Sequence, residues 1–333
     1  MGSKVAESGE LMTFRAALKK AHFDLMAEDD RVILIGEDVA DPMGGVYKVT
    51  VGLSDAFGVE RVRNTPISET AIVGTAIGSA ICGYLPICEV MYFDFFTTAM
   101  DQVVNQAALL HFMSGGQIQV PIVIRCTGGA GRSSAAQHSK SLEAWFAHVP
   151  GLGVWMASTP NDAYWMLRAA VQEGNPVILF EHAQLYGGVG YVDTSRPPDD
   201  LGQPRNVRQG TDVTLVTYGV CVGIAEDAAR VLSEDHGIEA DVFDLRYIAP
   251  LTLEGVIESS RRTGKVVIIH EAWGPFGPGA EIAFRISSEA FDALHGPVVR
   301  VAADHIPHPF DPRREKDMLP NVDRVVSAVL DYP

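Results

Sequence analysis

Two α/β domains, each a mainly parallel sheet flanked by helices, are the fold that this sequence predicts. The chain has 333 residues, about twice the length of a typical domain. Apolar runs of strand length alternate with stretches of helical periodicity, which is typical of a parallel sheet covered on both faces. A segment rich in Pro, Asp and Gly interrupts this pattern, which then begins again. We therefore expect a first domain at 11–190, a linker at 191–206 and a second domain at 207–333.

The first domain begins with an amphipathic helix. Residues 1–10 are polar and predict a flexible N-terminus. After Thr13, apolar residues recur on one helical face, from Phe14 to Leu25. Strands are expected at 32–35, 87–91, 122–126, 153–156 and 177–181, and further helices at 71–83, 98–113, 140–147 and 161–173.

The second domain repeats the alternation without any short internal repeat. Strands are expected at 213–218, 240–243, 266–270 and 298–301, and helices at 223–234, 252–261 and 279–294.

Composition narrows the class of protein. The formal net charge is −16 and the pI is near 5.0, so nucleic acid and anionic membranes would be repelled. The one long apolar stretch, 71–93, is interrupted by Gly83, Pro86 and Glu89, which disfavours a membrane span. The four cysteines show no CxxC spacing and lie in apolar runs. They predict buried free thiols in the cytoplasm.

The segment Pro66–Thr70 places a carboxylate at the start of a helix built from small residues. Pro66 sets the entry, Ser68 can cap, and Glu69 falls in the first turn, where the helix dipole favours a negative charge. Gly74 and Gly78 share one face that can approach another backbone closely. Glu69 is therefore either a simple helix stabiliser or half of a binding site.

Loops that follow the expected strands carry the remaining candidate chemistry, since ligands of parallel sheets bind at the carboxyl ends of strands. Glu37 and Asp38 follow the first strand, and the aromatic run 92–96 follows the second. That run either clamps a flat ring or packs in the core.

A glycine-rich loop at 128–131 leads to His138. Arg132 stands where a P-loop needs Lys, and Ser134 stands where a dinucleotide fingerprint needs its third glycine, so both of these phosphate-binding motifs fail. Two interpretations stay open: His138 exchanges a proton with a substrate, or it caps a helix that starts near Ser139. No metal-ligand spacing recurs among the histidines, and no GxSxG elbow is present.

Residues 11–330 resemble one known family. The chain resembles the β subunits of the thiamine-diphosphate-dependent E1 component of 2-oxo acid dehydrogenase complexes, including the pyruvate, branched-chain and acetoin systems. Collinear motifs carry the resemblance: Gly36-Glu37-Asp38-Val39, Gly44-Gly45-Val46, Pro66–Glu69, Asp101-Gln102, Asn105-Gln106-Ala107, Met113-Ser114-Gly115-Gly116, Ala136-Gln137-His138-Ser139, Pro150-Gly151-Leu152, Asn175-Pro176, Asp244-Leu245-Arg246 and Pro278-Gly279-Ala280-Glu281.

The resemblance implies a transketolase-like pyrimidine-binding domain, a transketolase C-terminal-like domain and a set of site residues. Glu69 would hydrogen-bond N1′ of the cofactor's aminopyrimidine and so activate thiamine diphosphate. Ile67, Met91 and Phe95 would line the pyrimidine pocket, and His138 would assist the transfer of the acyl group to a lipoyl group.

Metals and partners also follow from the resemblance. A structural potassium ion would lie at Ile122, Ala170, Glu173 and Asn175, mostly on main-chain carbonyls. The family binds Mg²⁺ and the diphosphate with a Gly-Asp-Gly motif and a later Asn-Asn pair, and this sequence contains neither. An α subunit would supply them in an α2β2 heterotetramer, and a lipoyl-bearing E2 acyltransferase would receive the acyl group.

The expected function is that of an oxidoreductase subunit: the oxidative decarboxylation of a 2-oxo acid with acyl transfer to lipoamide. One alternative is a thiamine-dependent acetoin-cleaving, acyloin or acyl-transfer enzyme, including one from secondary metabolism. An alternative of another class is a non-catalytic scaffolding subunit.

The sequence departs from the family at Thr98, where Gln is common, at Ala183, where a basic residue is common, and at Arg313–Glu315, which replaces a more apolar stretch.

Overall fold

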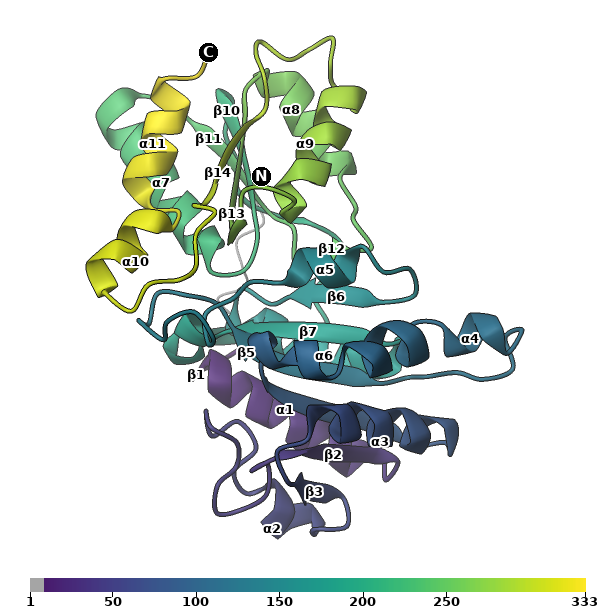
Figure 1. Cartoon of the computed structure of the whole chain (residues 1–333). Coiled ribbons are helices and arrows are strands. Elements are labelled where there is room, and N and C mark those ends of the chain that lie inside the picture. The colour runs from purple at the N-terminus through teal and green to yellow at the C-terminus, as the bar shows by residue number, and fades with distance from the viewer. Residues whose placement is uncertain (1–8) are drawn as a thin grey trace. The chain divides into compact units, whose positions relative to one another are not determined.

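The computed structural model describes residues 9–333, which form two compact α/β units (Figure 1). The N-terminal unit comprises 9–128 and 145–201, and the C-terminal unit comprises 129–144 and 202–333. Both are mainly parallel sheets flanked by helices, which confirms the predicted fold class.

The sheet of the N-terminal unit is parallel throughout its main ladder. Its strands lie in the order β6-β7-β5-β4-β2-β3. Their bounds are β2 (Val32–Glu37), β3 (Val62–Thr65), β4 (Leu85–Tyr92), β5 (Val123–Gly128), β6 (Gly153–Met156) and β7 (Val177–His182). The central strands are buried on both faces, and for this reason they read as continuous apolar runs.

Helices and single turns surround this sheet. They are α1 (Phe14–Glu28), α2 (Leu53–Phe57), α3 (Glu69–Ile81), the 3₁₀ turn η1 (Phe93–Thr98), the π-helical segment η2 (Asp101–Ala107), α4 (Leu110–Met113), α5 (Glu143–Ala147), α6 (Pro160–Gln172) and the 3₁₀ turn η3 (Ala183–Gly187). Helices α1 and α6 pack on each other, and α3 packs on β4 and η2. The predicted first helix is confirmed.

Local capping explains where two of these helices begin. Thr13 accepts a hydrogen bond from the backbone N–H of Ala16 at the start of α1. Thr159 and Asp162 form a reciprocal capping box at the start of α6, with Pro160 at the first helical position. Each cap satisfies N–H groups that a helix leaves unpaired.

A small antiparallel ladder, which the sequence did not indicate, joins β1 (Glu10–Thr13) to β8 (Val189–Val192). Residues 1–8 of the predicted flexible N-terminus lie outside the described residues, while Glu10 is the first residue of β1. This ladder brings the two ends of the N-terminal unit together.

The C-terminal unit has a sheet in the order β14-β13-β10-β11-β9, parallel except for β9. Its strands are β9 (Arg205–Arg208), β10 (Val213–Thr217), β11 (Ala240–Asp244), β13 (Val266–Trp273) and β14 (Val299–Ala303), with a further short strand β12 (Tyr247–Ala249). Its helices are α7 (Cys221–His236), α8 (Glu254–Thr263), α9 (Pro278–Glu289), α10 (Pro312–Met318) and α11 (Val322–Leu330).

The core of the C-terminal unit lies mainly under α7 and α11. Apolar side chains of both helices pack with those of β10, β11 and β13, while α8 and α9 pack on each other and on the same sheet (Figure 1). Each of these helices therefore buries one apolar stripe against the sheet.

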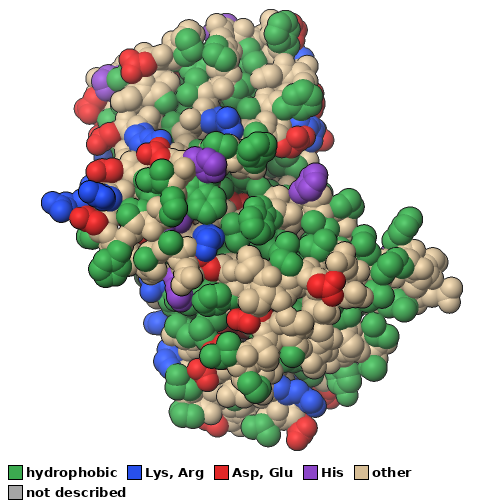
Figure 2. Space-filling model, viewed as in Figure 1, with side chains coloured by type: hydrophobic (Ala, Val, Ile, Leu, Met, Phe, Trp, Pro, Cys, Tyr) green, Lys and Arg blue, Asp and Glu red, His purple; other side chains and the backbone are tan. Residues whose placement is uncertain are grey.

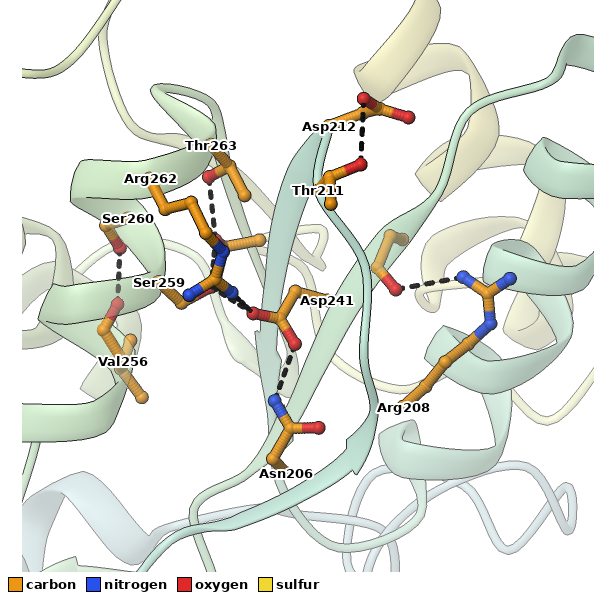
Figure 3. Close-up of polar contacts among 12 residues, drawn as sticks. Asn206, Arg208, Thr211, Asp212, Asp241, Val256, Ser259, Ser260, Arg262 and Thr263 are labelled. Carbon is orange, nitrogen blue, oxygen red and sulfur yellow. Dashed lines mark hydrogen bonds and ion pairs between the residues drawn. The ribbon is translucent and has the colours of Figure 1, made fainter. Parts of the chain in front are cut away.

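A buried carboxylate fixes the amino-terminal edge of this sheet. Asn206, Ser259 and Arg262 all point at Asp241 of β11 (Figure 3). The side chain of Asp241 is fully buried, and its oxygens accept from Asn206 Nδ2 at 2.5 Å and from Ser259 Oγ at 2.5 Å. These contacts tie the antiparallel strand β9 and helix α8 to β11 and compensate the buried charge.

Several predicted elements need correction. The helix expected at 98–113 is split into η1, η2 and α4, and the helix expected at 140–147 begins only at Glu143. The linker expected at 191–206 contains strand residues at both ends, since β8 ends at Val192 and β9 begins at Arg205. Cys82 is exposed rather than buried, although all four thiols are free.

No helix among residues 9–333 is both long and apolar enough to cross a bilayer.

Candidate cofactor site

Glu69 is the first residue of α3, at the carboxyl-terminal side of the N-terminal unit's sheet. Its position at the helix start agrees with the predicted first-turn carboxylate. The predicted cap by Ser68 is wrong: its hydroxyl donates to the carbonyl of Pro66 at 3.0 Å and makes no capping hydrogen bond. The negative charge of Glu69 therefore stabilises the start of α3 through its interaction with the helix dipole.

One carboxylate oxygen of Glu69 is held and the other is open. Thr98 Oγ1 lies 3.0 Å from Glu69 Oε2 and 2.9 Å from the carbonyl of Phe95, so its single proton serves one acceptor at a time. In the described part of the chain, Oε1 of Glu69 has no hydrogen-bond partner. A half-buried acceptor of this kind fits a ligand that presents an N–H.

Other carboxylates lie close to Glu69. Burial, followed by the charges of Asp38, Glu69 and Glu89, raises the pKa of Glu37, the last residue of β2. Glu89 lies on the neighbouring strand β4. The site is therefore electronegative and retains a proton on Glu37 more readily than an isolated carboxyl group does.

The aromatic run after β4 divides into fully buried rings, which confirm the predicted core packing, and half-buried rings. Phe93 and Phe96 are fully buried and pack against the ring of Phe146, with centroids 5.4 and 5.0 Å away. Tyr92 and Phe95 are only half-buried, and their rings meet edge to face at 6.1 Å. Phe93 and Phe96, three positions apart, thus build the core, while Tyr92 and Phe95, also three positions apart, form a partly open aromatic wall.

The remaining residues predicted for the pyrimidine pocket lie in the same unit. Met91 is half-buried near the end of β4, and Ile67 is 75% exposed, two residues before Glu69. An exposed apolar side chain, a thioether, an aromatic ring and an open carboxylate oxygen fit a flat heterocycle with N–H groups. The residues present are thus compatible with the aminopyrimidine of thiamine diphosphate.

A buried ion cluster beneath this wall was missed in the sequence. Arg125 of β5 binds Glu181 of β7 through two bonds of 2.6 and 2.7 Å, and binds Glu89 at 2.8 Å. Burial opposes the charge of Arg125, yet the two carboxylates raise its pKa. The signal was available: each of these charged residues interrupts an apolar strand.

Hydrogen bonds and ring contacts lead from this cluster to the aromatic wall. The hydroxyl of Tyr186 donates to Glu181 at 2.7 Å, and its ring stacks on Tyr47 at 4.6 Å. The hydroxyl of Tyr47 lies 2.9 Å from that of Tyr92, whose ring meets Phe95. The buried charges therefore support the position of the wall.

His138 belongs to the C-terminal unit and is half-buried. It lies in the loop Gly129–Lys140, which we call the His138 loop. The prediction that His138 caps a helix starting near Ser139 is wrong, because the next helix begins at Glu143. Ser133 and Ala135 in this loop have φ of +54° and +59°, a conformation that costs free energy for residues other than glycine.

The residues expected to hold potassium lie at the amino-terminal end of the strands of the N-terminal unit. The carbonyl of Ile122 accepts from the N–H of Val177 at 2.9 Å, and that of Ala170 accepts from Glu173 at 3.4 Å. Their immediate neighbours Pro121, Val171, Gln172 and Gly174 line one cavity of about 820 Å³. Carbonyl oxygens with a second lone pair suit a hard cation. Across residues 9–333, no three His, Cys, Asp or Glu side chains form a metal cluster.

Comparison with family models matches both units. Residues 10–188 match the transketolase pyrimidine-binding domain, and residues 202–325 match the transketolase C-terminal domain.

Relatives with assigned names align over nearly the whole chain. The pyruvate dehydrogenase E1 component subunit β of Rickettsia felis is 42% identical over 96% of this chain and 97% of its own length. The 3-methyl-2-oxobutanoate dehydrogenase subunit β of Mycobacterium tuberculosis is 40% identical over 98% and 93% of the two chains. The acetoin:2,6-dichlorophenolindophenol oxidoreductase subunit β of Cupriavidus necator is 39% identical over 95% and 96%.

Solved structures share the fold at low identity. A split-gene transketolase, described as an inactive β4 tetramer, superposes with a TM-score of 0.80 at 24% identity and covers 96% of this chain and 98% of its own. The transketolase of Leishmania mexicana gives a TM-score of 0.72 at 15% identity, covering 99% of this chain and 46% of its own.

Proposed function

Because the chain belongs to the family of 2-oxo acid dehydrogenase E1 β subunits, built from the two transketolase domains, we propose that it supplies half of a thiamine-diphosphate site. The reaction would be the oxidative decarboxylation of a 2-oxo acid, with the acyl unit passed to lipoamide. The observation that carries this proposal is Glu69, with one oxygen held by Thr98 and the other without a hydrogen-bond partner among residues 9–333. Phe95 and Met91 of the same unit are half-buried.

The cofactor, when bound, stabilises the carbanion formed by decarboxylation. The residues of this chain orient it and set its protonation. Glu69 would hydrogen-bond the ring nitrogen of the pyrimidine, and Ile67, Met91 and Phe95 would line the pocket around the ring. Thr98 donates a hydrogen bond to Glu69 and restrains its rotamer. Burial and the neighbouring carboxylates raise the pKa of Glu37, so it takes up a proton more readily than an isolated carboxyl group.

His138 is proposed to act later, in the transfer of the acyl unit to the lipoyl group. Imidazole exchanges protons near neutral pH, as this transfer requires. This assignment rests on the matching Ala136-Gln137-His138-Ser139 motif.

An α subunit is the proposed primary partner, in an α2β2 assembly. The sequence has neither the Gly-Asp-Gly motif nor the Asn-Asn pair that bind Mg²⁺ and diphosphate in thiamine enzymes. Both units expose large apolar side chains, and Figure 2 shows such side chains spread among charged ones on the face in view. Ile67 (75% exposed), Phe112 (85%) and Phe276 (94%) are the kind of residues that a partner chain covers.

We also propose that potassium binds at Ile122, Ala170, Glu173 and Asn175. Because mostly backbone carbonyls would hold the ion, its removal is expected to loosen the ends of β5, β7 and α6. The thermal midpoint should be higher in KCl than in NaCl at equal ionic strength. Equal midpoints would contradict this assignment.

The proposed location is the cytoplasm, where reducing conditions keep thiols free.

An acetoin-cleaving or other acyl-transfer enzyme is the second candidate, favoured by the 39% identity to the acetoin oxidoreductase subunit. Co-expression with the α subunit, followed by turnover with pyruvate, branched-chain 2-oxo acids and acetoin, separates the two. Turnover of a 2-oxo acid together with capture of a lipoyl-bearing E2 supports the first function. Turnover of acetoin alone supports the second, and assembly without any turnover would indicate a scaffolding subunit.

A further inference from the structure

Two buried carboxylates of the C-terminal unit hold the His138 loop at different points. The loop closes at its base, where the N–H of Gly129 donates to the carbonyl of Lys140 at 3.4 Å. Beside this closure, Glu271 Oε1 accepts from the N–H of Ala130 at 2.7 Å and from Ser141 Oγ at 3.0 Å. A single oxygen thus bridges both sides of the base.

The second carboxylate lies on helix α10. Glu315 Oε2 accepts from the N–H of Ser133 at 2.7 Å and from Ser133 Oγ at 3.3 Å. Glu315 is only 2% exposed although it belongs to the charged run Arg313–Glu315, where the sequence departs from its family. An anionic acceptor for a backbone N–H is stronger than a neutral one.

Apolar packing fixes the same loop against the same helix. Ala130 is fully buried in a small cluster with Ala303, Met318 and Leu319. Met318 ends α10, so the loop meets this helix through Ala130 and again through Ser133. Both contacts lie on the side of the loop that precedes His138.

The backbone between these contacts is one that would relax without support. Ser133 and Ala135 both have positive φ, and each such residue costs free energy that surrounding contacts must offset. The bond from Ser133 N–H to Glu315 acts on one of these two residues directly. Glu315 therefore offsets strain in the segment that leads to His138, while Glu271 holds the base of the loop.

We infer that Glu271 and Glu315 are positioning residues for His138, which hold its loop in the conformation used for acyl transfer. The inference rests on the proposed role of His138. Neither carboxylate is assigned a contact with substrate or cofactor, so their loss should affect acyl transfer to the lipoyl group and spare decarboxylation.

The test uses the reconstituted α/β enzyme with the 2-oxo acid that it turns over best. Decarboxylation is measured with the dye 2,6-dichlorophenolindophenol, and acyl transfer is measured with an isolated lipoyl domain. Hydrogen exchange of peptides covering 129–141 reports on the loop directly. The variants are Glu315→Ala, Glu271→Ala, their Gln counterparts, and His138→Ala. Asp241→Ala is the matched control, because it removes an equally buried carboxylate of the same unit that does not contact the loop.

Both Ala variants should speed exchange in 129–141 and lower kcat for acyl transfer by about 10- to 100-fold, with dye reduction within about twofold of wild type. The Gln variants should restore most of the transfer, since the amide oxygen can still accept. The control Asp241→Ala should neither speed exchange in 129–141 nor lower kcat for acyl transfer. If hydrogen exchange in 129–141 is unchanged in both Ala variants, the inference is overturned. It is also overturned if both Ala variants keep wild-type acyl transfer while His138→Ala abolishes it. Unchanged transfer in His138→Ala overturns the proposed role of His138 itself.

Discussion

Glu69 shows how one side chain can meet two demands. As the first residue of α3, it complements the helix dipole. Its second oxygen, which Thr98 does not hold, can accept a hydrogen bond from a ligand, and helix stability does not need this. The two interpretations left open by the sequence are therefore compatible, and only the cofactor role predicts an effect on catalysis.

Thr98→Val tests how far the rotamer of Glu69 matters. The change removes the donor to Glu69 Oε2 and keeps the size of the side chain. We expect kcat of the α/β enzyme to fall by about 3- to 10-fold, which corresponds to about 1 kcal/mol for one hydrogen bond. Steady-state turnover measures this directly.

Thr97→Val is the control for that change. Its hydroxyl donates to the carbonyl of Asp94 at 3.0 Å, inside the same 3₁₀ turn, and does not touch Glu69. Equal losses in both variants would mean that the turn, and not the bond to Glu69, is responsible.

At the level of elements, Arg125 links strands β4, β5 and β7 through its ion pairs. This residue is 1% exposed and compensates two carboxylates, Glu89 and Glu181. Arg125→Met would leave both without a counter-ion. We expect the free energy of unfolding to fall by about 3–5 kcal/mol, as measured by denaturant titration.

Arg31→Met gives the comparison on the surface. Arg31 pairs with Asp29 at 2.7 Å, but its side chain is 63% exposed. That loss should be much smaller, because solvent screens an exposed ion pair. A loss for Arg125→Met no larger than that for Arg31→Met would show that the buried cluster contributes little net stability.

Periodicity predicted the strands of both units well because parallel strands are buried on both faces. The strand expected at 153–156 is observed with those bounds, and those at 177–181 and 240–243 are one residue short. The helix expected at 98–113 failed because η2 is π-helical, and a 3.6-residue period cannot reveal such a segment. Strand β9 was hidden in an apparent linker, since three of its four residues are polar and it lies at the edge of the sheet.

The site was predictable only where a single residue carries the chemistry. Glu69 is marked by its place after Pro66 and before a run of small residues. The division of the aromatic run into a buried pair and a half-buried pair, and the ion cluster of Arg125, depend on contacts between strands far apart in the sequence. No local pattern encodes these contacts.

At the level of the whole molecule, each unit contains a buried neutral histidine. Burial, followed by the charge of Arg125, lowers the pKa of His22 to about 3, and burial lowers that of His270 to about 4. Below pH 6.5 the unfolded chain binds a proton at each position while the folded chain does not. The free energy of unfolding therefore falls as the pH falls from 6.5 toward 4, by about 1.4 kcal/mol per pH unit for each histidine.

Variants separate these two contributions from those of the carboxyl groups. Denaturant titrations at pH 7, 6 and 5 should show a smaller pH dependence in His22→Leu and in His270→Leu than in wild type. The effect should be confined to the unit that contains the substitution if the units unfold separately. A slope that is unchanged in both variants would contradict the assignment of neutral, buried imidazoles.

The chain carries a formal net charge of −16 and lacks the diphosphate-binding motif of thiamine enzymes. Its family relatives are named as subunits of larger enzymes. We propose that this chain provides the pyrimidine half of a shared thiamine-diphosphate site through Glu69.

The most direct test of that claim is the turnover of the α/β enzyme carrying Glu69→Gln, at saturating thiamine diphosphate and Mg²⁺, with the exposed Glu60→Gln as control. We predict a fall in kcat of about 100-fold or more for Glu69→Gln, with unchanged assembly with the α subunit and unchanged turnover in the control. Turnover of Glu69→Gln equal to that of wild type would contradict the account.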